Sequence, residues 1–217
     1  MGFSPRSPQL IRGGIVLVDP DTGRALRVIT LQYNPDTLTR SLQIKGVGGD
    51  AGDFSEAMRL KGPPVETIKL EAEIDATDQL ETADPQATQL GIHPQLALLE
   101  TLVYPNSVQL LANKGEAQSG SIEIAPMQSP LTLFVWSKTR VLPVRVTEFT
   151  ITEEGFDTAL NPVRAKVSLG MRVLTVDDLG FEHKGGSLFM SYLEQKEQLA
   201  ARIANASFGA LGITGIP

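Results

Sequence analysis

The chain has 217 residues, of which 41% are hydrophobic and 20% charged, a balance that supports one large folded domain rather than disorder. Its net charge of -6 argues against nucleic acid as the main partner. The absence of cysteine excludes disulfides, thiol nucleophiles and thiolate metal sites.

The N-terminal arm, residues 1–14, lacks the apolar core of a signal peptide, and no apolar stretch reaches the length of about 18 residues typical of a membrane helix. We therefore expect a protein that is made in the bacterial cytoplasm and does not insert into a membrane. The expected organisation is an arm over 1–14, a β domain over 15–178, and a C-terminal helix with an apolar tail over 179–217.

The first half of the domain is dominated by predicted strands, at 15–18, 26–33, 37–44 and 65–76. In the last of these, apolar residues alternate with charged ones, so Glu71, Glu73 and Asp75 share one face. Such a row of carboxylates is compatible with a hard-cation site, but a solvated or intersubunit face is the preferred interpretation.

The middle of the chain is mostly irregular in pattern. The glycine-rich loop 46–52 lacks the Lys-Ser/Thr pair of a phosphate cradle. The polar stretch 78–91 is expected to be a loop, and Pro94 opens a predicted helix to about Val103. A short strand is expected at 108–111, followed by a long loop or β-hairpin insertion over 114–130.

Two long strands are predicted in the second half. Over 142–152 the apolar residues change parity, which predicts a β-bulge near Thr147-Glu148. From Val163 to Val173 every second residue is apolar and the opposite face is basic, with Arg164, Lys166 and Arg172. A strand that is dry on one side and charged on the other suits a barrel wall or a ring-forming subunit.

The C-terminal region has a different character. Ser187 is a plausible N-cap for a helix over 188–206. Leu188, Tyr192, Leu199 and Ile203 lie close to one stripe of this helix, and the apolar tail 207–217 follows. We expect this stripe and the tail to dock on a partner.

Catalytic chemistry has little support in the sequence. The two histidines, His93 and His183, are far apart, and no cluster has metal-ligand spacing. Glu153-Glu154 is better explained as a turn than as an acid–base pair, and Trp136 as a core or interface anchor. We therefore expect a protein that is not an enzyme and that has no cofactor, catalytic residue or bound metal.

A series of short motifs occurs in a characteristic order: Tyr33-Asn34-Pro35, Lys61-Gly62-Pro63-Pro64, Phe134-Val135-Trp136, Phe149-Thr150-Ile151-Thr152 and Asn161-Pro162-Val163-Arg164-Ala165-Lys166-Val167-Ser168-Leu169. In these motifs, from about Ile15 to Val176, the chain resembles the contractile injection system tube protein family. That family includes the N-terminal domain of the baseplate hub adaptor of phage-tail-like particles.

The resemblance implies a mainly β fold: a phage-tail-tube-like antiparallel β-barrel with one packed helix, here with a C-terminal helical extension. It implies a structural protein of a contractile injection particle, in the hub-adaptor or tube-initiator layer that links the central spike to the inner tube. The implied partners are further copies in a hexameric ring, the spike, the inner tube and other baseplate proteins. The resemblance is compatible with a particle that stays in the cytoplasm and with one that is released from the cell. Many hub adaptors continue into a LysM domain, and we expect none after the helix and tail of this sequence.

Two alternatives remain open at this stage. One is the inner tube or tube-cap subunit of the same particle, although the extension over 188–217 favours an adaptor. The other is a small-ligand-binding β-barrel. On the ring hypothesis, the predicted subunit interface joins an acidic and a basic strand face, made of Glu71, Glu73, Asp75, Arg164, Lys166 and Arg172.

Overall fold

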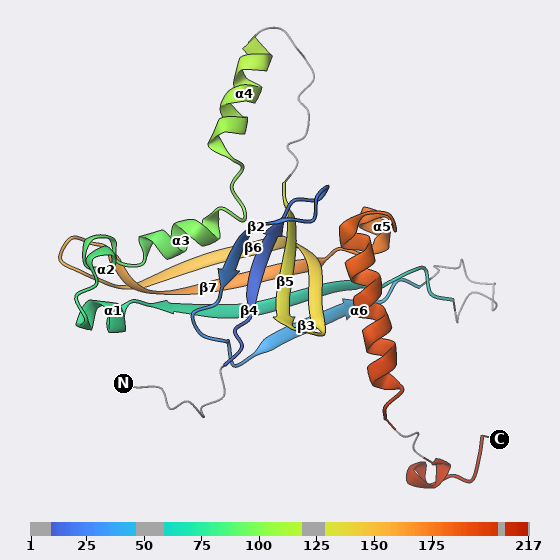
Figure 1. Cartoon of the computed structure of the whole chain (residues 1–217). Helices are drawn as coiled ribbons and strands as arrows, with labels where there is room; N and C mark the ends of the chain where they lie inside the picture. The colour runs from blue at the N-terminus through green and yellow to red at the C-terminus, as the bar shows by residue number, and fades with distance from the viewer. Residues whose placement is uncertain (1–9, 47–58, 119–128, 204–206, 217) are drawn as a thin grey trace.

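The computed structural model describes residues 10–46, 59–118, 129–203 and 207–216. Within them, strands form one antiparallel sheet in the order β2-β1-β5-β6-β7-β4-β3 (Figure 1). The strands are β1 (Gly14–Val18), β2 (Ala25–Thr30), β3 (Leu38–Gln43), β4 (Val65–Asp75), β5 (Leu131–Ser137), β6 (Arg140–Phe156) and β7 (Pro162–Val173). The predicted mainly β fold with flanking helices is confirmed.

One hydrophobic core is shared by the sheet and the helices that cover it. In Figure 1, β1, β2 and β5 run steeply across the long strands β4 and β7, so the sheet curves around this core. The alternation read from the sequence accounts for the packing, because Ile68 of β4 and Val167 of β7 are completely buried while the residues that follow them, Lys69 and Ser168, are exposed. The inner side of the long strands is therefore dry and the outer side polar.

The predicted bulge in β6 is confirmed. The register of β6 against β7 shifts between Val146 and Glu148, so Thr147 is the extra residue. Val146, Phe149 and Ile151 consequently all pack against the same core despite their opposite parity.

The curved sheet keeps two edges. The strand pairs of the described residues do not join β2 to β3, so no hydrogen-bonded ladder closes the expected barrel. Instead, the side-chain amide of Gln32, just after β2, hydrogen-bonds the backbone of Asp75 at the end of β4. The Nε2 of Gln32 donates to the carbonyl oxygen of Asp75 at 2.7 Å, and the N–H of Asp75 donates to Oε1 of Gln32 at 3.1 Å.

Among the described residues, four helices lie between β4 and β5: α1 (Thr77–Glu81), α2 (Pro85–Leu90), α3 (His93–Glu100) and α4 (Ser107–Gln118). The expected loop over 78–91 is wrong, because Asp84 caps α2 through the N–H groups of Gln86 and Ala87, with Pro85 in the first turn. The expected strand at 108–111 is also wrong, since that run begins a helix capped by Asn106. The predicted insertion over 114–130 starts as helix, and 119–128 fall outside the described residues, as does the predicted loop 46–52 from residue 47 onward.

After β7 the structure describes three further helical segments: α5 (Val176–Leu179), α6 (Lys184–Ala200) and the 3-10 helix η1 (Phe208–Leu211). The predicted N-cap of α6 at Ser187 is wrong, because the helix begins at Lys184. His183 is the N-cap, and its Nδ1 accepts a hydrogen bond from the N–H of Gly185. A Cβ on Gly186 would lie 1.9 Å from the carbonyl oxygen of Gly180, so this glycine permits α5 and α6 to approach each other closely. Residues 204–206 at the predicted helix end are not described.

None of the helices in the described ranges is both long and apolar enough to cross a membrane.

Candidate assembly interface

The outer face of β4, β6 and β7 carries opposite charges in facing rows. Arg164 of β7 lies between Asp75 of β4 and Glu154 of β6, and Lys166 lies opposite Glu73. The predicted acidic and basic faces are therefore cross-strand neighbours within one chain. We call this surface the charge ladder: Lys69, Glu71, Glu73, Asp75, Arg145, Glu148, Glu154, Arg164, Lys166 and Arg172.

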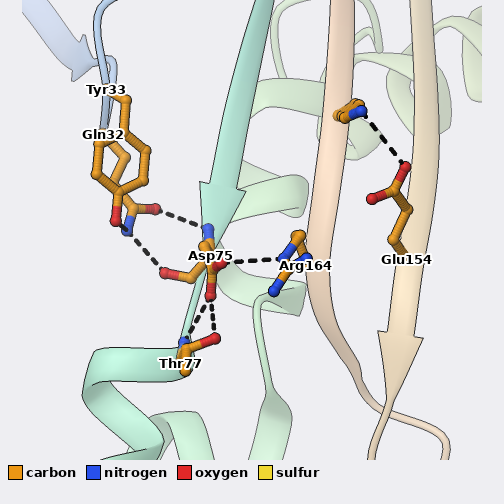
Figure 2. Close-up of polar contacts among 7 residues, drawn as sticks. Gln32, Tyr33, Asp75, Thr77, Glu154 and Arg164 are labelled. Carbon is orange, nitrogen blue, oxygen red and sulfur yellow. Dashed lines mark hydrogen bonds and ion pairs between the residues drawn. The ribbon is translucent and has the colours of Figure 1, made fainter.

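Asp75 is the best-connected carboxylate at the helical end of the charge ladder (Figure 2). Its Oδ2 accepts a hydrogen bond from Nε of Arg164 at 3.0 Å, and its Oδ1 accepts from the N–H of Thr77 at 2.7 Å and from the hydroxyl of the same residue. Burial acts to raise the pKa of Asp75, but the Thr77 hydrogen bonds and the Arg164 guanidinium outweigh it and hold the pKa below its usual value. Asp75 is therefore ionised and committed to partners of its own chain.

Gln32 fixes the same corner from the other edge of the sheet. In Figure 2 its amide faces the backbone of Asp75, with Tyr33 beside it. The Nε2 of Gln32 lies 3.3 Å from the hydroxyl of Tyr33 as well as 2.7 Å from the carbonyl oxygen of Asp75. The segment after β2 is thus hydrogen-bonded to the end of β4 at Asp75, the residue whose carboxylate contacts Arg164.

The other predicted basic residues also have partners in the same chain. Lys166 lies 3.8 Å from the carboxylate of Glu154, and Arg172 lies 2.7 Å from that of Asp178 at the start of α5. Glu71 and Glu73 are exposed, and within the described ranges no cation lies within ion-pair distance of either. The charge ladder is thus partly neutralised before any partner arrives, and its role as a subunit interface stays a prediction.

A glycine makes room for one ion pair that spans β7. Gly170 lies opposite Lys69 and Glu148 in the two neighbouring strands, whose charged groups meet at 2.7 Å. A Cβ on Gly170 would lie 2.9 Å from the Cβ of Glu148, closer than side chains normally approach. The glycine in the basic strand therefore has a packing reason.

The second predicted site, on the C-terminal helix, divides into two halves. Leu188 packs against a small cluster under β5, and Tyr192 is buried in the main core, so these two residues serve the chain's own packing. Leu199 is 50% exposed and Ile203 is 77% exposed. Partner docking through the helix remains a prediction for these last two residues.

A buried carboxylate anchors α6, and sequence reasoning missed it. Glu66 of β4 is only 3% exposed, and it receives Arg40 of β3 at 2.7 Å and Lys196 of α6 at 3.3 Å. The Tyr192 hydroxyl lies 2.9 Å from Nη2 of Arg40 and 3.4 Å from Glu66. The Lys196 ammonium also lies over the Tyr192 ring, 4.1 Å from its centre. A signal was available, because Glu66 has the parity of Ile68 on the core face of its strand.

Metal binding has no geometric support among the residues that the structure describes, where no group of three or more His, Asp or Glu side chains converges.

No family model matches the sequence, and no curated protein matches it. Similar solved structures include a chain of the virion of a native gene transfer agent particle, at 11% identity and a TM-score of 0.28 over 75% of this chain and 91% of that chain. Another belongs to the tail of an empty gene transfer agent particle with C6 symmetry, at 12% identity and a TM-score of 0.29 over 75% of this chain and 90% of that chain. Similarity at this level carries no argument about function.

Proposed function

We propose that the chain is a structural component of a phage-tail-like contractile injection particle, forming one ring in the hub-adaptor or tube-initiator layer. The observation that carries this proposal is the pair of uncovered sheet edges. Strands β2 and β3 end the described sheet without a neighbour on their outer sides. Uncovered edges in a folded protein invite pairing with another chain, and a ring supplies that neighbour in a controlled way.

The edges have the composition of a contact surface. Leu26 and Val28 are exposed on β2, on either side of Arg27, and exposed apolar side chains are unfavourable on an edge that must stay free in water. At the other end, β3 pairs only with Val65 to Leu70. The outer edge of β4 at Glu71 and Glu73 therefore has no strand beside it in the described part of the chain.

The motif series resembling the tube protein family supports the same function, and the helical extension favours an adaptor over an inner tube subunit. The ligand-binding barrel is less well supported. Its interior would have to be hollow, whereas Ile68, Val167 and Met171 fill the inside of the sheet and are fully buried. The proposed partners are five further copies in a hexamer, the spike, the inner tube and baseplate proteins, assembled in the bacterial cytoplasm.

The test is the location and copy number of the chain in particles. We expect electron microscopy of purified particles carrying a labelled chain to show one ring between spike and tube. Quantitative mass spectrometry should give the copy number of a single ring, whereas many copies along the tube would indicate a tube subunit. Absence of the chain from intact particles would overturn the proposal.

A further inference from the structure

The segment over residues 31–35, which we call the strap, joins separate parts of the sheet without belonging to a described strand. It follows β2 and leads toward β3, and it contains the motif Tyr33-Asn34-Pro35. Pro35 has no backbone N–H to contribute to a strand ladder. In the strap, the side-chain amides of Gln32 and Asn34 make hydrogen bonds of the kind that a neighbouring strand would make.

Gln32 uses both backbone groups that Asp75 presents at the outer edge of β4. In Figure 2 its amide faces this backbone, accepting from the N–H of Asp75 at 3.1 Å and donating to the carbonyl oxygen at 2.7 Å. Paired residues of antiparallel strands exchange the same two hydrogen bonds, and a side-chain amide carries the same donor and acceptor as a peptide group. Because β3 pairs with β4 only as far as Leu70, the strap takes the place of a strand at Asp75.

Asn34 makes the corresponding contacts with the segment that leads into β1. Its Oδ1 accepts from the N–H of Gly13 at 2.8 Å, and its Nδ2 donates to the carbonyl oxygen of Ile11 at 2.9 Å. The N–H of Leu31 donates to the carbonyl oxygen of Gly13 at 2.9 Å. Trp136 lies close to the same glycine, since a Cβ there would be 2.7 Å from the indole ring. The strap therefore holds the end of β4 and the approach to β1 together.

The surroundings of the strap would favour pairing with other chains if its hydrogen bonds were absent. Leu10, Ile11 and Tyr33 are exposed beside it, at 83%, 70% and 47%. Unpaired N–H and C=O groups next to exposed apolar side chains lead to strand addition and aggregation. A loop that covers such backbone groups is one of the means by which folded proteins prevent this pairing.

We propose that the strap prevents strand addition, because its side-chain amides fill the hydrogen-bonding positions that a strand of another chain would use at Asp75 and at 11–13. Glu71 and Glu73 lie outside the strap, so a strand that pairs with β4 there ends before Asp75. The inference does not depend on the proposed function, since unwanted pairing is a hazard for the isolated chain as well as for a ring subunit.

The test removes the amides one at a time from the full chain. Gln32→Ala should speed hydrogen exchange of the Asp75 amide at least tenfold, and Asn34→Ala should do the same for the Gly13 amide, as measured by NMR. Both variants should aggregate at least fivefold faster than the unchanged protein, followed by light scattering and thioflavin T fluorescence. Gln43→Ala, at an exposed glutamine of the edge strand β3, is the matched control and should change neither quantity.

Loss of overall stability is a separate route to aggregation, so a core variant is needed for comparison. Val144→Ala removes buried atoms of β6 and leaves the strap intact, and urea unfolding gives the stability of every variant. Gln32→Asn, whose side chain is one methylene shorter, is a milder variant and should show smaller effects in the same direction. Unchanged exchange at Asp75 and Gly13 would overturn the inference, as would strap variants that aggregate no faster than Val144→Ala.

Discussion

Asp75 shows how one side chain joins three parts of the sheet. Its carboxylate receives Arg164 from β7 and Thr77 from α1, while its backbone receives Gln32 from the segment after β2. Because these partners hold the charged form, the free energy of unfolding includes a contribution that is present above the unfolded pKa of 3.8. That contribution is lost as the pH falls through the lowered pKa of the folded state.

We expect Asp75→Asn to lower the free energy of unfolding by about 1 kcal/mol at pH 7, because it removes a charge-assisted pair on a partly exposed face. The difference from the unchanged protein should shrink as the pH falls from 3.8 through the lowered pKa of the folded state, where Asp75 itself becomes neutral. Urea unfolding at pH 7 and at pH 3 measures both values. Glu73→Gln, on the same strand face and without a described ion pair, is the control. A difference that stays constant with pH would contradict this account.

At the scale of elements, the attachment of α6 depends on a charge inside the core rather than on its apolar stripe alone. The helix buries Phe189 and Tyr192, but its next turn is fixed by Lys196 at Glu66. A buried carboxylate is costly unless its lone pairs are used, and here Arg40, Lys196 and Tyr192 surround it. The arrangement therefore specifies one position of the helix on the sheet.

Glu66→Gln should lower the free energy of unfolding by about 2 kcal/mol, because it leaves two cations without their shared carboxylate. The value is set below that of a fully buried pair because both cations are partly exposed. Urea unfolding gives the stability, and hydrogen exchange of the α6 amides reports whether the helix loosens first. Glu194→Gln, exposed on the same helix, should change neither quantity. Equal loss in both variants would show that Glu66 has no special role.

The alternation of apolar and polar residues in the sequence predicted the long strands, which have one buried and one exposed face. The strands around Ile68 and Val167 were expected close to their observed bounds, and the parity change at Thr147 predicted the bulge. The expected turn at Glu153-Glu154 was wrong, because β6 continues through both residues to Phe156. Helices α1, α2 and α4 were missed because short or weakly periodic helices leave no clear repeat, and a run such as 108–111 fits a strand equally well. Side-chain caps at Asp84 and Asn106 mark the starts of α2 and α4, and a search for periodicity overlooks them, whereas α1 has no side-chain cap at its N-terminus.

The sequence predicted which charged residues lie on the outer face of each strand, but not which of them contact one another. The parity of β4 and β7 predicted which charges point outward, but not that Asp75 and Arg164 would meet in one chain, because register depends on the whole sheet. The hydrogen bonds between the Gln32 side chain and the backbone of Asp75 could not be predicted from the sequence, because these residues are 43 positions apart. Long-range pairing of this kind follows from tertiary structure.

At the scale of the whole molecule, the charge ladder is balanced. It contains the five acidic residues Glu71, Glu73, Asp75, Glu148 and Glu154 and the five basic residues Lys69, Arg145, Arg164, Lys166 and Arg172, so its net charge is zero. The net charge of -6 therefore comes from the rest of the chain. A neighbour that meets the charge ladder would recognise its pattern of charges and not an overall sign.

The double variant Asp75→Arg with Arg164→Glu separates folding from assembly, because it keeps an ion pair within the chain and inverts the pattern seen from outside. We expect it to remain folded, while ring formation weakens by about tenfold if the charge ladder meets a neighbour. Thermal unfolding and light scattering measure the two effects. Arg164→Glu alone, which faces Asp75 and Glu154, should lose stability and is the comparison. Unchanged ring formation by the folded double variant would remove the charge ladder from the interface.

The bulge at Thr147 controls which side of β6 faces the core over the second half of the strand. Before it, β6 pairs with β5 as far as Val144, and after it the strand continues along β7 to Phe156. Without the extra residue, Phe149 and Ile151 would turn toward water, and Glu148 and Glu154 would turn toward the core. The extra residue at Thr147 therefore determines which side chains of β6, the longest described strand, face the core and which face the solvent. The amphipathic character of this strand depends on the number of its residues as much as on their identity.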